Sequence, residues 1–571
     1  MTVVPRLTLL LAISFLAPQA LTSGQGTRPA LSFGVPIASD MKSGEVHEYG
    51  LTPVTAGDLV SGTMEVRGLA ALVQVLDRGG AVIRTDYFFE DPRPVPRRIG
   101  FVAPVAGAYR VQIKGFDRFS WGGQVNPGPR VGVVGTASGS YTLRLENAPV
   151  AVRMRGVDIP VREDYPSLRL QRLTQDLQAG RPDALQSFWK EVAGKGPLLE
   201  AIAGNERDVD VTFLWREIYD TRNVLVLWAG RMDDGYMSRL AGTDIWYKTV
   251  RLRRGTRLDY LISPNDRAED QNLTTQPDPL NPRKDPDDPN YPFARSSVLD
   301  MPGAPDEQWA LRTPVRRGTI EEKTITSTLL KNMRPIPNFL NNQRPIWIYT
   351  PPGYMPAAGP YPLVILFDGA AYVGSAPATF DNLINDGRIR PAIVCFDPGN
   401  RGNAGGLARA KSYGDALVQE LMPMLRASYP ISSNPADIVI GGFSAGGRAA
   451  AMIALFHPEV FGNVLSQSGS FREGMAGGAE EPNESARAYL EAPRQPIRFY
   501  LEVGLYDNVP GADGPLYQFA LDETNLGGNR HLRDVLRAKG YGVTYREVGG
   551  SHENIHWRAM LADGLMTLLK R

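Results

Sequence analysis

The spacing of hydrophobic residues changes along the chain and divides it into regions. Over residues 44–146, apolar and polar residues alternate in short runs separated by Gly, Pro and Asp, as in residues 101–113 and 138–146. Period-two alternation broken by turn residues is typical of half-buried antiparallel strands. The pattern predicts an accessory β-sandwich over residues 35–150.

Helical spacing replaces this alternation in the next region. Apolar residues recur on one helix face in residues 168–177 and 185–192, and Pro182 stands where the second helix would begin. Proline is favoured at a helix start because the N–H that it lacks would have no partner there. We expect residues 151–204 to form a helical connector.

A second β-rich region follows the connector. Its runs are dominated by aromatic and β-branched residues, as in a small immunoglobulin-like sandwich. These runs are residues 209–215, 223–228, 243–249 and 257–262. Residues 264–305 are rich in Pro, Asp and Asn, which disfavour helices and central strands, so we expect an extended linker there. The lobe and its linker span residues 205–315.

From about residue 319 onward, strand-like and helical stretches alternate. This order predicts a mainly parallel sheet covered by helices on both faces. The expected strands are residues 344–349, 361–367, 391–396, 437–440, 497–503 and 542–548. The chain is thus predicted to be multidomain, with an α/β domain over residues 316–571 preceded by two β-sandwich domains and the connector.

Composition excludes some partners. A chain of 571 residues, 43% of them hydrophobic, can build several cores. Its formal net charge of +1 gives no electrostatic reason to expect nucleic acid or an anionic membrane as a partner.

The first residues suggest export. One arginine precedes an apolar run over residues 7–17, which is too short to span a bilayer and is followed by small residues. This predicts a signal peptide over residues 1–25 and a periplasmic or secreted protein, with a retained anchor or a buried strand as alternatives. No later segment has the length of a membrane span. The single cysteine, Cys395, lies in an apolar run and is expected in the core, so export rests on the leader alone.

The clearest chemical signal is the motif Gly442-x-Ser444-x-Gly446. A predicted buried strand leads into it and an Ala-rich helix follows, which is the context of the nucleophile elbow of an α/β-hydrolase. Glycines are needed where a Cβ would collide in the sharp turn, and the helix N-terminus favours developing negative charge. We predict that Ser444 is a nucleophile; the alternative is an ordinary turn serine.

A serine nucleophile needs a base, and the chain has few histidines. They are His47, His457, His531, His552 and His556. Only His552 directly follows the last predicted strand through the turn at residues 549–551, where this fold places its base. His552 is the predicted base, and His556 is the alternative.

Asp507 is the predicted acid of the triad. It follows the penultimate predicted strand, and the order Ser444, Asp507, His552 matches the α/β-hydrolase order. Its carboxylate would orient the imidazole and stabilise the charged form, although a turn-capping role is an alternative. The substitutes further along the same loop are Asp513, Asp522 and Glu523.

The remaining site residues follow from the fold. An oxyanion hole should combine the N–H of Ala445 with that of Gly369 or Ala370, in the loop after residues 361–367. Further candidate substrate-binding residues are Tyr372, Arg401, Phe443 and Arg448. The sequence has no paired-histidine spacing, Cys-x-x-Cys or phosphate-binding glycine loop, so we expect neither a metal nor a cofactor.

Several further stretches form a specific set. They are residues 211–215, 242–249, 349–354, 366–369 and 461–470, and the spacing His552-x-x-x-x-Trp557. Together they resemble the enterochelin esterase (siderophore esterase) family over residues 207–571. The resemblance implies an immunoglobulin-like lobe and an ester-cleaving α/β-hydrolase, with nucleophile and base at Ser444 and His552. Residues 101–110 resemble the pre-peptidase C-terminal module, which implies a binding or spacing accessory.

Two stretches depart from the family pattern. Phe471-Arg472-Glu473 stands where the family has an aromatic cluster, and Gly-Asn-Ala-Gly-Gly-Leu follows Arg401. We predict a serine carboxylic-ester hydrolase that acts outside the cytoplasm on a small-molecule or polymer-linked ester. The alternatives are a feruloyl- or acetyl-type carbohydrate esterase, a peptidase of the same fold, or an inert hydrolase-fold binding protein. The oligomeric state stays open.

Overall fold

A computed structural model gives the fold of most of the chain. It describes residues 28–89, 97–119, 132–149, 167–228, 235–266, 271–285, 296–330, 342–398, 407–471, 483–507 and 524–570. The chain divides into two compact units, Met1–Asp117 with Val134–Ala148, and Arg118–Val133 with Pro149–Arg571.

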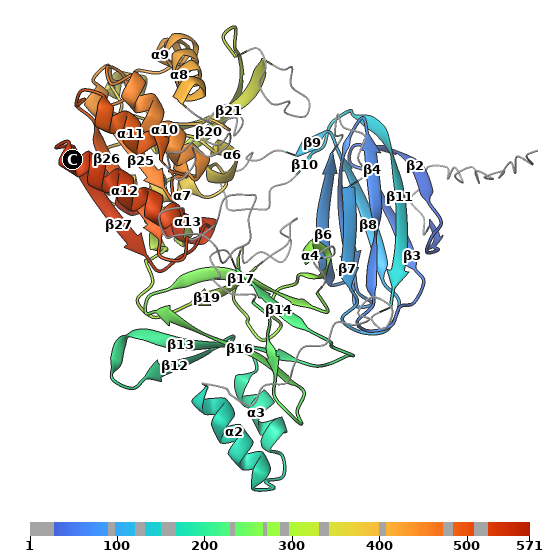
Figure 1. Ribbon diagram of the computed structural model, residues 1–571. Helices are drawn as coiled ribbons and strands as arrows, with labels where there is room; N and C mark the ends of the chain where they lie inside the picture. Colours follow the sequence, from blue (N-terminus) through green and yellow to red (C-terminus); the bar gives the residue numbers. More distant parts are fainter. Residues whose placement is uncertain are drawn as a thin grey trace, which may run out of the picture. The chain divides into compact units, whose positions relative to one another are not determined.

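The first unit consists of two β-sheets that share one core (Figure 1). One sheet has the order β1(Arg28–Leu31)-β3(Val46–Leu51)-β8(Arg110–Phe116)-β5(Ala70–Leu76)-β6(Val82–Phe89). The other has the order β2(Ile37–Lys42)-β11(Ser138–Ala148)-β4(Leu59–Arg67)-β7(Arg97–Val102). Alternate residues such as Val111 and Ile113 on β8, and Tyr141 and Leu143 on β11, are buried. The N-terminal part is β-rich, as the alternation predicted.

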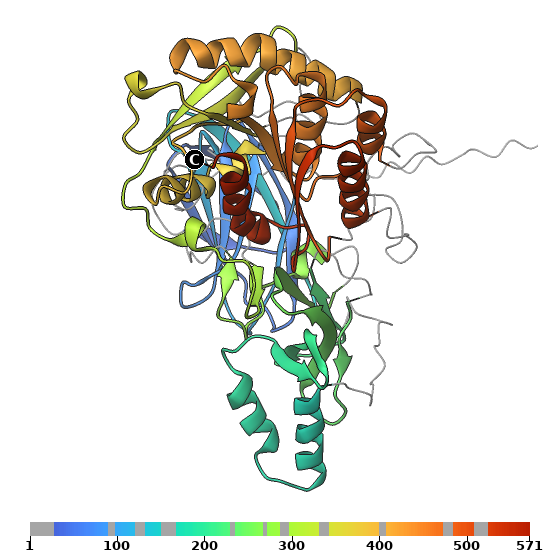
Figure 2. The same cartoon turned by 90° about the vertical axis from the view of Figure 1, so that its left-hand side faces the viewer.

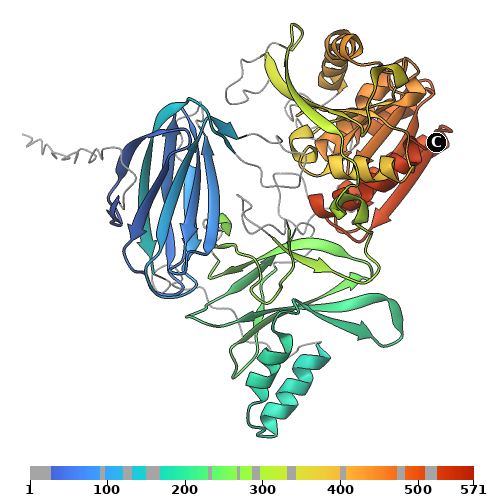
Figure 3. The same ribbon diagram turned by 180° about the vertical axis from the view of Figure 1, so that it is seen from behind.

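Two helices of the second unit precede its larger sheets in sequence. Helix α2 (Leu168–Gln178) begins at Ser167, whose hydroxyl accepts the N–H of Leu170, and α3 (Ala184–Val192) follows after a short turn. Their apolar faces bury Leu170 and Phe188 against strands of the following lobe. Figure 3 shows this pair of helices beside the lobe.

The lobe, defined here as strands β12–β19 with the short helices α4 (Gln271–Thr274) and α5 (Gln308–Leu311), contains two four-stranded sheets. They are β12(Leu198–Ile202)-β13(Asn205–Arg216)-β16(Ile245–Arg253)-β15(Ser238–Arg239) and β14(Val224–Leu227)-β17(Arg257–Pro264)-β19(Ser296–Asp300)-β18(Lys284–Asp285). A further two-stranded pair, β9 (Arg118–Phe119) with β10 (Gly132–Val133), precedes the helices in sequence.

The expectation of an extended linker over residues 264–305 is wrong for the described part of that stretch. Residues Ser296–Asp300 form β19, which pairs with β17 inside the lobe. Two of its polar residues, Asp278 and Asn281, are buried with partners: Asp278 accepts the Tyr260 hydroxyl at 2.6 Å, and Asn281 donates to the Val298 carbonyl at 2.8 Å. These Asp and Asn side chains thus form hydrogen bonds inside the lobe, whereas in an exposed linker they would bond to water.

The C-terminal region has one eight-stranded sheet. Its order is β20(Thr319–Thr326)-β21(Gln343–Thr350)-β23(Ile393–Phe396)-β22(Leu363–Leu366)-β24(Ile438–Phe443)-β25(Asn463–Gln467)-β26(Arg498–Gly504)-β27(Gly542–Val548). β20, β21 and β23 pair antiparallel, and the strands from β23 to β27 pair parallel. The strands β22, β23 and β24 are completely buried, as expected for a sheet covered on both faces.

Helices cover both faces of this sheet (Figure 2). One face packs against α8(Leu407–Ala416), α9(Met422–Ser428), α10(Ala445–Phe456), α11(Glu484–Glu491) and α12(Asn525–Ala538). The other packs against α6(Gly369–Tyr372), α7(Ala376–Asn385) and α13(Asn554–Leu568). On β22, Ile365 belongs to the first core and Val364 and Leu366 to the second, as the period of a strand requires. Within the described ranges, no helix is both long and apolar enough to cross a membrane.

Candidate active site

Ser444 lies at the turn between β24 and α10. Its backbone has φ 53° and ψ −124°, a strained conformation that a non-glycine residue rarely adopts. The flanking glycines permit the turn, because a Cβ on Gly442 would lie 2.9 Å from the carbonyl carbon of Gly446. A Cβ on Gly446 would lie 2.3 Å from Asp368 Oδ2. The motif therefore requires glycine at position 442, where the nearest atom belongs to the backbone, while a Cβ at position 446 would displace the Asp368 side chain.

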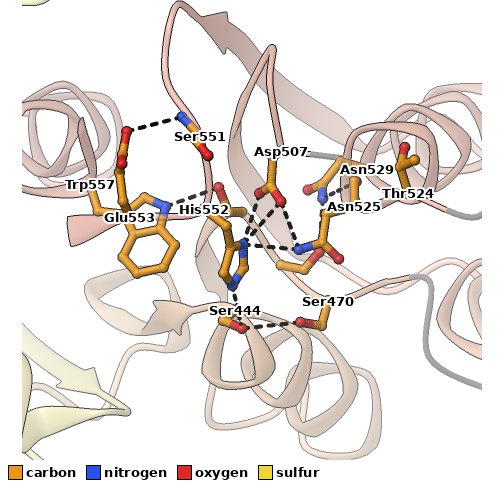
Figure 4. A network of polar contacts seen from close by, with 12 residues as sticks. Ser444, Ser470, Asp507, Thr524, Asn525, Asn529, Ser551, His552, Glu553 and Trp557 are labelled. Atoms are coloured by element: carbon orange, nitrogen blue, oxygen red, sulfur yellow. Dashed lines mark hydrogen bonds and ion pairs between the residues drawn. The ribbon is translucent and has the colours of Figure 1, made fainter. Parts of the chain in front are cut away.

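The structure brings Ser444, His552 and Asp507 into one chain of contacts (Figure 4). His552 Nε2 lies 2.9 Å from Ser444 Oγ, and His552 Nδ1 lies 3.0 Å from Asp507 Oδ2 and 3.1 Å from Oδ1. The Asp507 side chain has no exposed surface, whereas 19% of the His552 side chain is exposed. Asp507 follows β26 and His552 follows β27; these are adjacent parallel strands, so their carboxyl ends meet at one edge of the sheet.

Two residues near this triad were missed by the sequence reasoning. Asn525, in the first turn of α12, places Nδ2 3.1 Å from Asp507 Oδ1 and 3.0 Å from His552 Nδ1. Ser470 Oγ lies 3.2 Å from Ser444 Oγ (Figure 4). Asn525 has no local motif that could have identified it, while Ser470 belongs to a stretch that carried the family resemblance.

The structure distinguishes the candidate oxyanion amides. Ala445 begins α10 directly behind Ser444 and is partly exposed. The Gly369 N–H donates to the Asp397 carbonyl at 2.8 Å, which engages it inside the protein. The Ala370 N–H bonds to no described residue, and Ala370 is partly exposed. Of the two candidates for the second oxyanion amide, Ala370 is therefore the one whose N–H has no partner among the described residues.

The four further substrate-binding candidates differ in their surroundings. Arg448 is 2% exposed and donates to Glu484 at 2.8 Å, so its guanidinium is engaged inside the protein. Tyr372 is buried and its hydroxyl donates to Gln467 at 2.7 Å. Arg401 lies outside the described residues.

Phe443, the fourth of these candidates, belongs to an aromatic wall beside the triad. Its ring stacks on Trp557 with centroids 4.3 Å apart, and the Tyr372 ring is tilted against it with centroids 5.2 Å apart. Trp557 in turn meets His552 edge-on, with ring centroids 5.0 Å apart. The wall restricts the positions that the His552 ring can adopt.

The alternatives for base and acid do not reach Ser444 among the described residues. His556 is buried, with Nε2 3.4 Å from Glu502 Oε2. His47 contacts the Tyr141 hydroxyl in the first unit, and His457 contacts Glu459. The acid substitutes at 513, 522 and 523 lie outside the described residues.

The single cysteine is buried, as expected. Burial raises the pKa of the Cys395 thiol well above its usual value, which disfavours the reactive thiolate. Within the part of the chain that the structure describes, no group of three or more His, Cys, Asp or Glu side chains is placed to hold a metal ion.

The comparisons with known proteins show which family the chain belongs to. Residues 338–568 match the family described as putative esterase, and residues 210–310 match the family described as enterochelin esterase, N-terminal. The iron(III) salmochelin esterase of Escherichia coli O6:H1 is 30% identical over 436 residues, which is 71% of this chain and 98% of the relative. The chain belongs to the enterochelin esterase family.

Other members of the family match over the same extent. The iron(III) enterobactin esterase of Escherichia coli O6:H1 is 28% identical over 67% of this chain and 96% of its own length. The crystal structure of the enterobactin esterase of Shigella flexneri in the presence of enterobactin covers 67% of this chain and 97% of that chain, with 25% identity and a TM-score of 0.51. This enterochelin esterase family member is therefore a carboxylic-ester hydrolase with a β-rich N-terminal region.

Proposed function

We propose that this esterase cleaves an ester by nucleophilic catalysis, with Ser444 as nucleophile, His552 as general base and Asp507 as the acid that orients the base. The observation that carries the proposal is the continuous chain of contacts at 2.9 Å and 3.0 Å from Ser444 Oγ to Asp507. A base must lie within hydrogen-bond reach of the proton that it removes, and both contacts meet that requirement.

The first half of the reaction forms an acyl-enzyme. Ser444 Oγ attacks the ester carbonyl carbon while its proton passes to His552 Nε2. Asp507 accepts the Nδ1–H of His552 and stabilises the imidazolium that forms. The carbonyl oxygen becomes negative and accepts the N–H groups of Ala445 and Ala370, with the N-terminus of α10 adding a favourable dipole. The carbon–oxygen bond then breaks, and the alcohol leaves with the proton from His552.

The second half restores the enzyme. His552 removes a proton from water, the hydroxide attacks the acyl carbon, and the same amides stabilise the second oxyanion. Breaking the bond to Oγ returns the proton from His552 to Ser444 and releases the carboxylic acid. Burial of Asp507 supports this cycle, because water does not compete for its contact with His552.

We infer that the substrate is an ester bond within an iron(III) siderophore, with iron as cargo of the substrate. Relatives named as iron(III) salmochelin and iron(III) enterobactin esterases match over 98% and 96% of their lengths, which supports this class. The sequence departs from the family pattern after Ser470 and after Arg401, and these departures concern the detailed structure of the substrate. Hydrolysis of ferric enterobactin, a feruloyl ester and p-nitrophenyl butyrate, compared by kcat/KM, tests the class; a preference for the feruloyl ester would contradict it.

The decisive test of the mechanism is Ser444→Ala. We expect hydrolysis of p-nitrophenyl butyrate to fall by about 10³- to 10⁶-fold, with labelling by a fluorophosphonate probe lost and the Tm preserved. Ser485→Ala is the matched control, because Ser485 is a fully buried serine on α11 with no hydrogen bond to its hydroxyl among described residues. Wild-type turnover in folded Ser444→Ala would falsify the assignment.

Three finer features belong to the same proposal. The apolar run at residues 7–17 supports a leader that directs the esterase to the periplasm or the medium, which cell fractionation and N-terminal sequencing of the mature protein test. The β-sandwich of the first unit serves as an accessory for binding or spacing. The helices α2 and α3 act as the connector between this accessory and the lobe.

A further inference from the structure

We propose that the lobe of strands β12–β19 positions the acid and the base of the triad. Tyr506 and Glu553 are the positioning residues through which the lobe acts. The turn between β16 and β17 and the first residues of β17 contact both loops that carry Asp507 and His552. The inference rests on the catalytic roles proposed above and assigns the lobe a function in the reaction itself.

The acid loop is tied to the lobe through Tyr506. The Tyr506 hydroxyl, one residue before Asp507, accepts the N–H of Arg253 at 2.6 Å. The Tyr506 ring meets Trp228 of the lobe edge-on, with centroids 5.6 Å apart. The Tyr506 N–H donates to the Gly550 carbonyl at 2.9 Å, so the same residue also joins the acid loop to the base loop.

The base loop is tied to the lobe ahead of His552. The Gly549 carbonyl accepts the N–H of Arg257, the first residue of β17, at 2.7 Å. The approach is close enough that a Cβ on Gly549 would lie 2.7 Å from Thr256 Cα. Only a glycine allows the two backbones to meet at this distance.

The same loop is tied to the lobe again directly after His552. Glu553 is 6% exposed, and its Oε2 accepts the N–H of Asp259 on β17 at 3.0 Å. Its Oε1 accepts the N–H of Ser551 at 3.3 Å. One buried side chain thus holds the residue before His552 and a strand of the lobe together.

Helix α13, which begins just beyond His552, has its own contact with the lobe. Arg558 donates to Glu307 at 2.9 Å and 2.6 Å, and Glu307 is 4% exposed. Arg257 also lies 3.2 Å from Glu307. The loop that carries His552 is therefore held by the lobe at its start, at its end and through the helix that follows.

These contacts bear on catalysis because the reaction depends on sub-ångström placement of the imidazole. A displacement of about 1 Å can cost roughly 100-fold in rate. The loops at residues 504–507 and 549–553 leave the sheet at the ends of β26 and β27. Beyond that point their described hydrogen bonds to the lobe, to each other and, at Asp507, to Asn525 and Leu526 of α12 set their positions.

The test removes one hydroxyl and keeps the ring. Tyr506→Phe deletes the acceptor of the Arg253 N–H. Tyr541→Phe is the matched control, because the Tyr541 hydroxyl also accepts a backbone N–H, that of Gln495 at 3.0 Å, and lies away from the triad. The readouts are kcat and KM for p-nitrophenyl butyrate, the rate of fluorophosphonate labelling and the Tm. We expect Tyr506→Phe to lower kcat and the labelling rate by about 5- to 30-fold with KM changed less than about twofold.

A second pair of variants keeps the inference testable from the other loop. Glu553→Ala should lower kcat and labelling more than Glu553→Gln, because glutamine keeps one carbonyl acceptor for the two N–H groups. Glu420→Ala is the control; Glu420 accepts the N–H groups of Thr328 and Leu329 and is remote from the triad. A Tm loss with wild-type kcat and labelling rate in folded Tyr506→Phe and Glu553→Ala would overturn the positioning role. The fluorophosphonate probe tells the two failures apart. If it labels the wild type and not Ser444→Ala, the proposed mechanism holds, and only the positioning role is overturned.

Discussion

At the scale of single residues, the site depends on one strained position. Ser444 adopts φ 53° and ψ −124°, which costs about 1–3 kcal/mol in isolation. Its N–H donates to the Gln467 carbonyl at 2.9 Å, and its carbonyl accepts the Ser470 N–H at 3.0 Å. These two hydrogen bonds hold Ser444 in this conformation, in which its Oγ lies 2.9 Å from His552 Nε2.

The two neighbouring histidines give a residue-scale prediction. His552→Ala should lower kcat/KM by about 10³-fold or more, because Nε2 of this ring is the atom 2.9 Å from Ser444 Oγ. His556→Ala should keep most of the activity, because its ring contacts Glu502 instead and is fully buried. Steady-state kinetics with p-nitrophenyl butyrate on both folded variants decides; a larger loss in His556→Ala would reverse the assignment.

At the scale of elements, the elbow and the oxyanion loop are packed against one another. Gly446 at the start of α10 leaves no room for a side chain, since its Cβ would meet Asp368 Oδ2 at 2.3 Å and Phe367 Cβ at 3.1 Å. Asp368 precedes α6, which carries the Ala370 amide. We therefore expect a change in the elbow to affect the proposed oxyanion hole.

Gly446→Ala tests this coupling. We expect kcat for p-nitrophenyl butyrate to fall by about 10- to 1,000-fold, the range for loss of an oxyanion contact, as the Asp368 loop moves away. Gly542→Ala is the control, because the atom nearest to its Cβ would be Arg498 Cγ at 3.9 Å. Equal activity of Gly446→Ala and Gly542→Ala would show that the elbow tolerates a Cβ.

Glu553, which links β17 to the loop that carries His552, should make the stability of the protein depend on pH. Burial, and then the nearby Asp259 carboxylate, raise the pKa of Glu553 well above its ordinary value of 4.5. Above pH 4.5 and below the raised pKa, the folded protein keeps this proton and the unfolded chain loses it, so the free energy of unfolding falls as pH rises. The Tm of Glu553→Gln minus that of the wild type should therefore increase as the pH rises above about 4.5.

Glu420 provides a control of opposite sign for this measurement. Although burial opposes it, hydrogen bonds from Ser327 and Thr328 lower the pKa of the Glu420 carboxyl. Its stabilisation is present above the ordinary pKa and is lost as pH falls, so Glu420→Gln should become less stable relative to the wild type as pH rises. A pH-independent difference for Glu553→Gln would contradict the protonated form of Glu553.

At the scale of the whole molecule, the proposed catalytic residues and the β-sandwich of the first unit belong to different parts of the chain. Each proposed catalytic side chain belongs to the second unit, and the family matches begin at residue 210. The first unit has a buried core of its own, shared by its two sheets. Its loss should therefore leave the second unit folded.

A truncated chain that starts near Val161 tests this division. It should stay soluble and keep its kcat/KM for small soluble esters, while it loses any attachment to a polymeric substrate that the sandwich provides. Full-length protein under the same conditions is the reference. A loss of more than about tenfold in kcat/KM, equal to about 1.4 kcal/mol, in a well-folded truncated chain would show that the sandwich takes part in shaping the site.

The sequence by itself determined the features that depend on local chemistry. A strand, Gly442-x-Ser444-x-Gly446 and a helix can follow one another in few ways, so the elbow was predictable from neighbouring residues. The positions of Asp507 and His552 after the last two strands were predictable because parallel strands align their carboxyl ends; their catalytic roles stay predictions until the variants are measured.

The tertiary structure decided the features that depend on residues distant in sequence. Asn525 reaches Asp507 across 18 positions and Glu553 reaches the Asp259 N–H across 294, separations for which no local pattern exists. Burial decided that Arg448 pairs with Glu484, and pairing with β17 converted part of a Pro- and Asp-rich stretch into β19. Spacing along the chain sets which side chains an element presents; the neighbours that satisfy or bury them are set only when the elements pack.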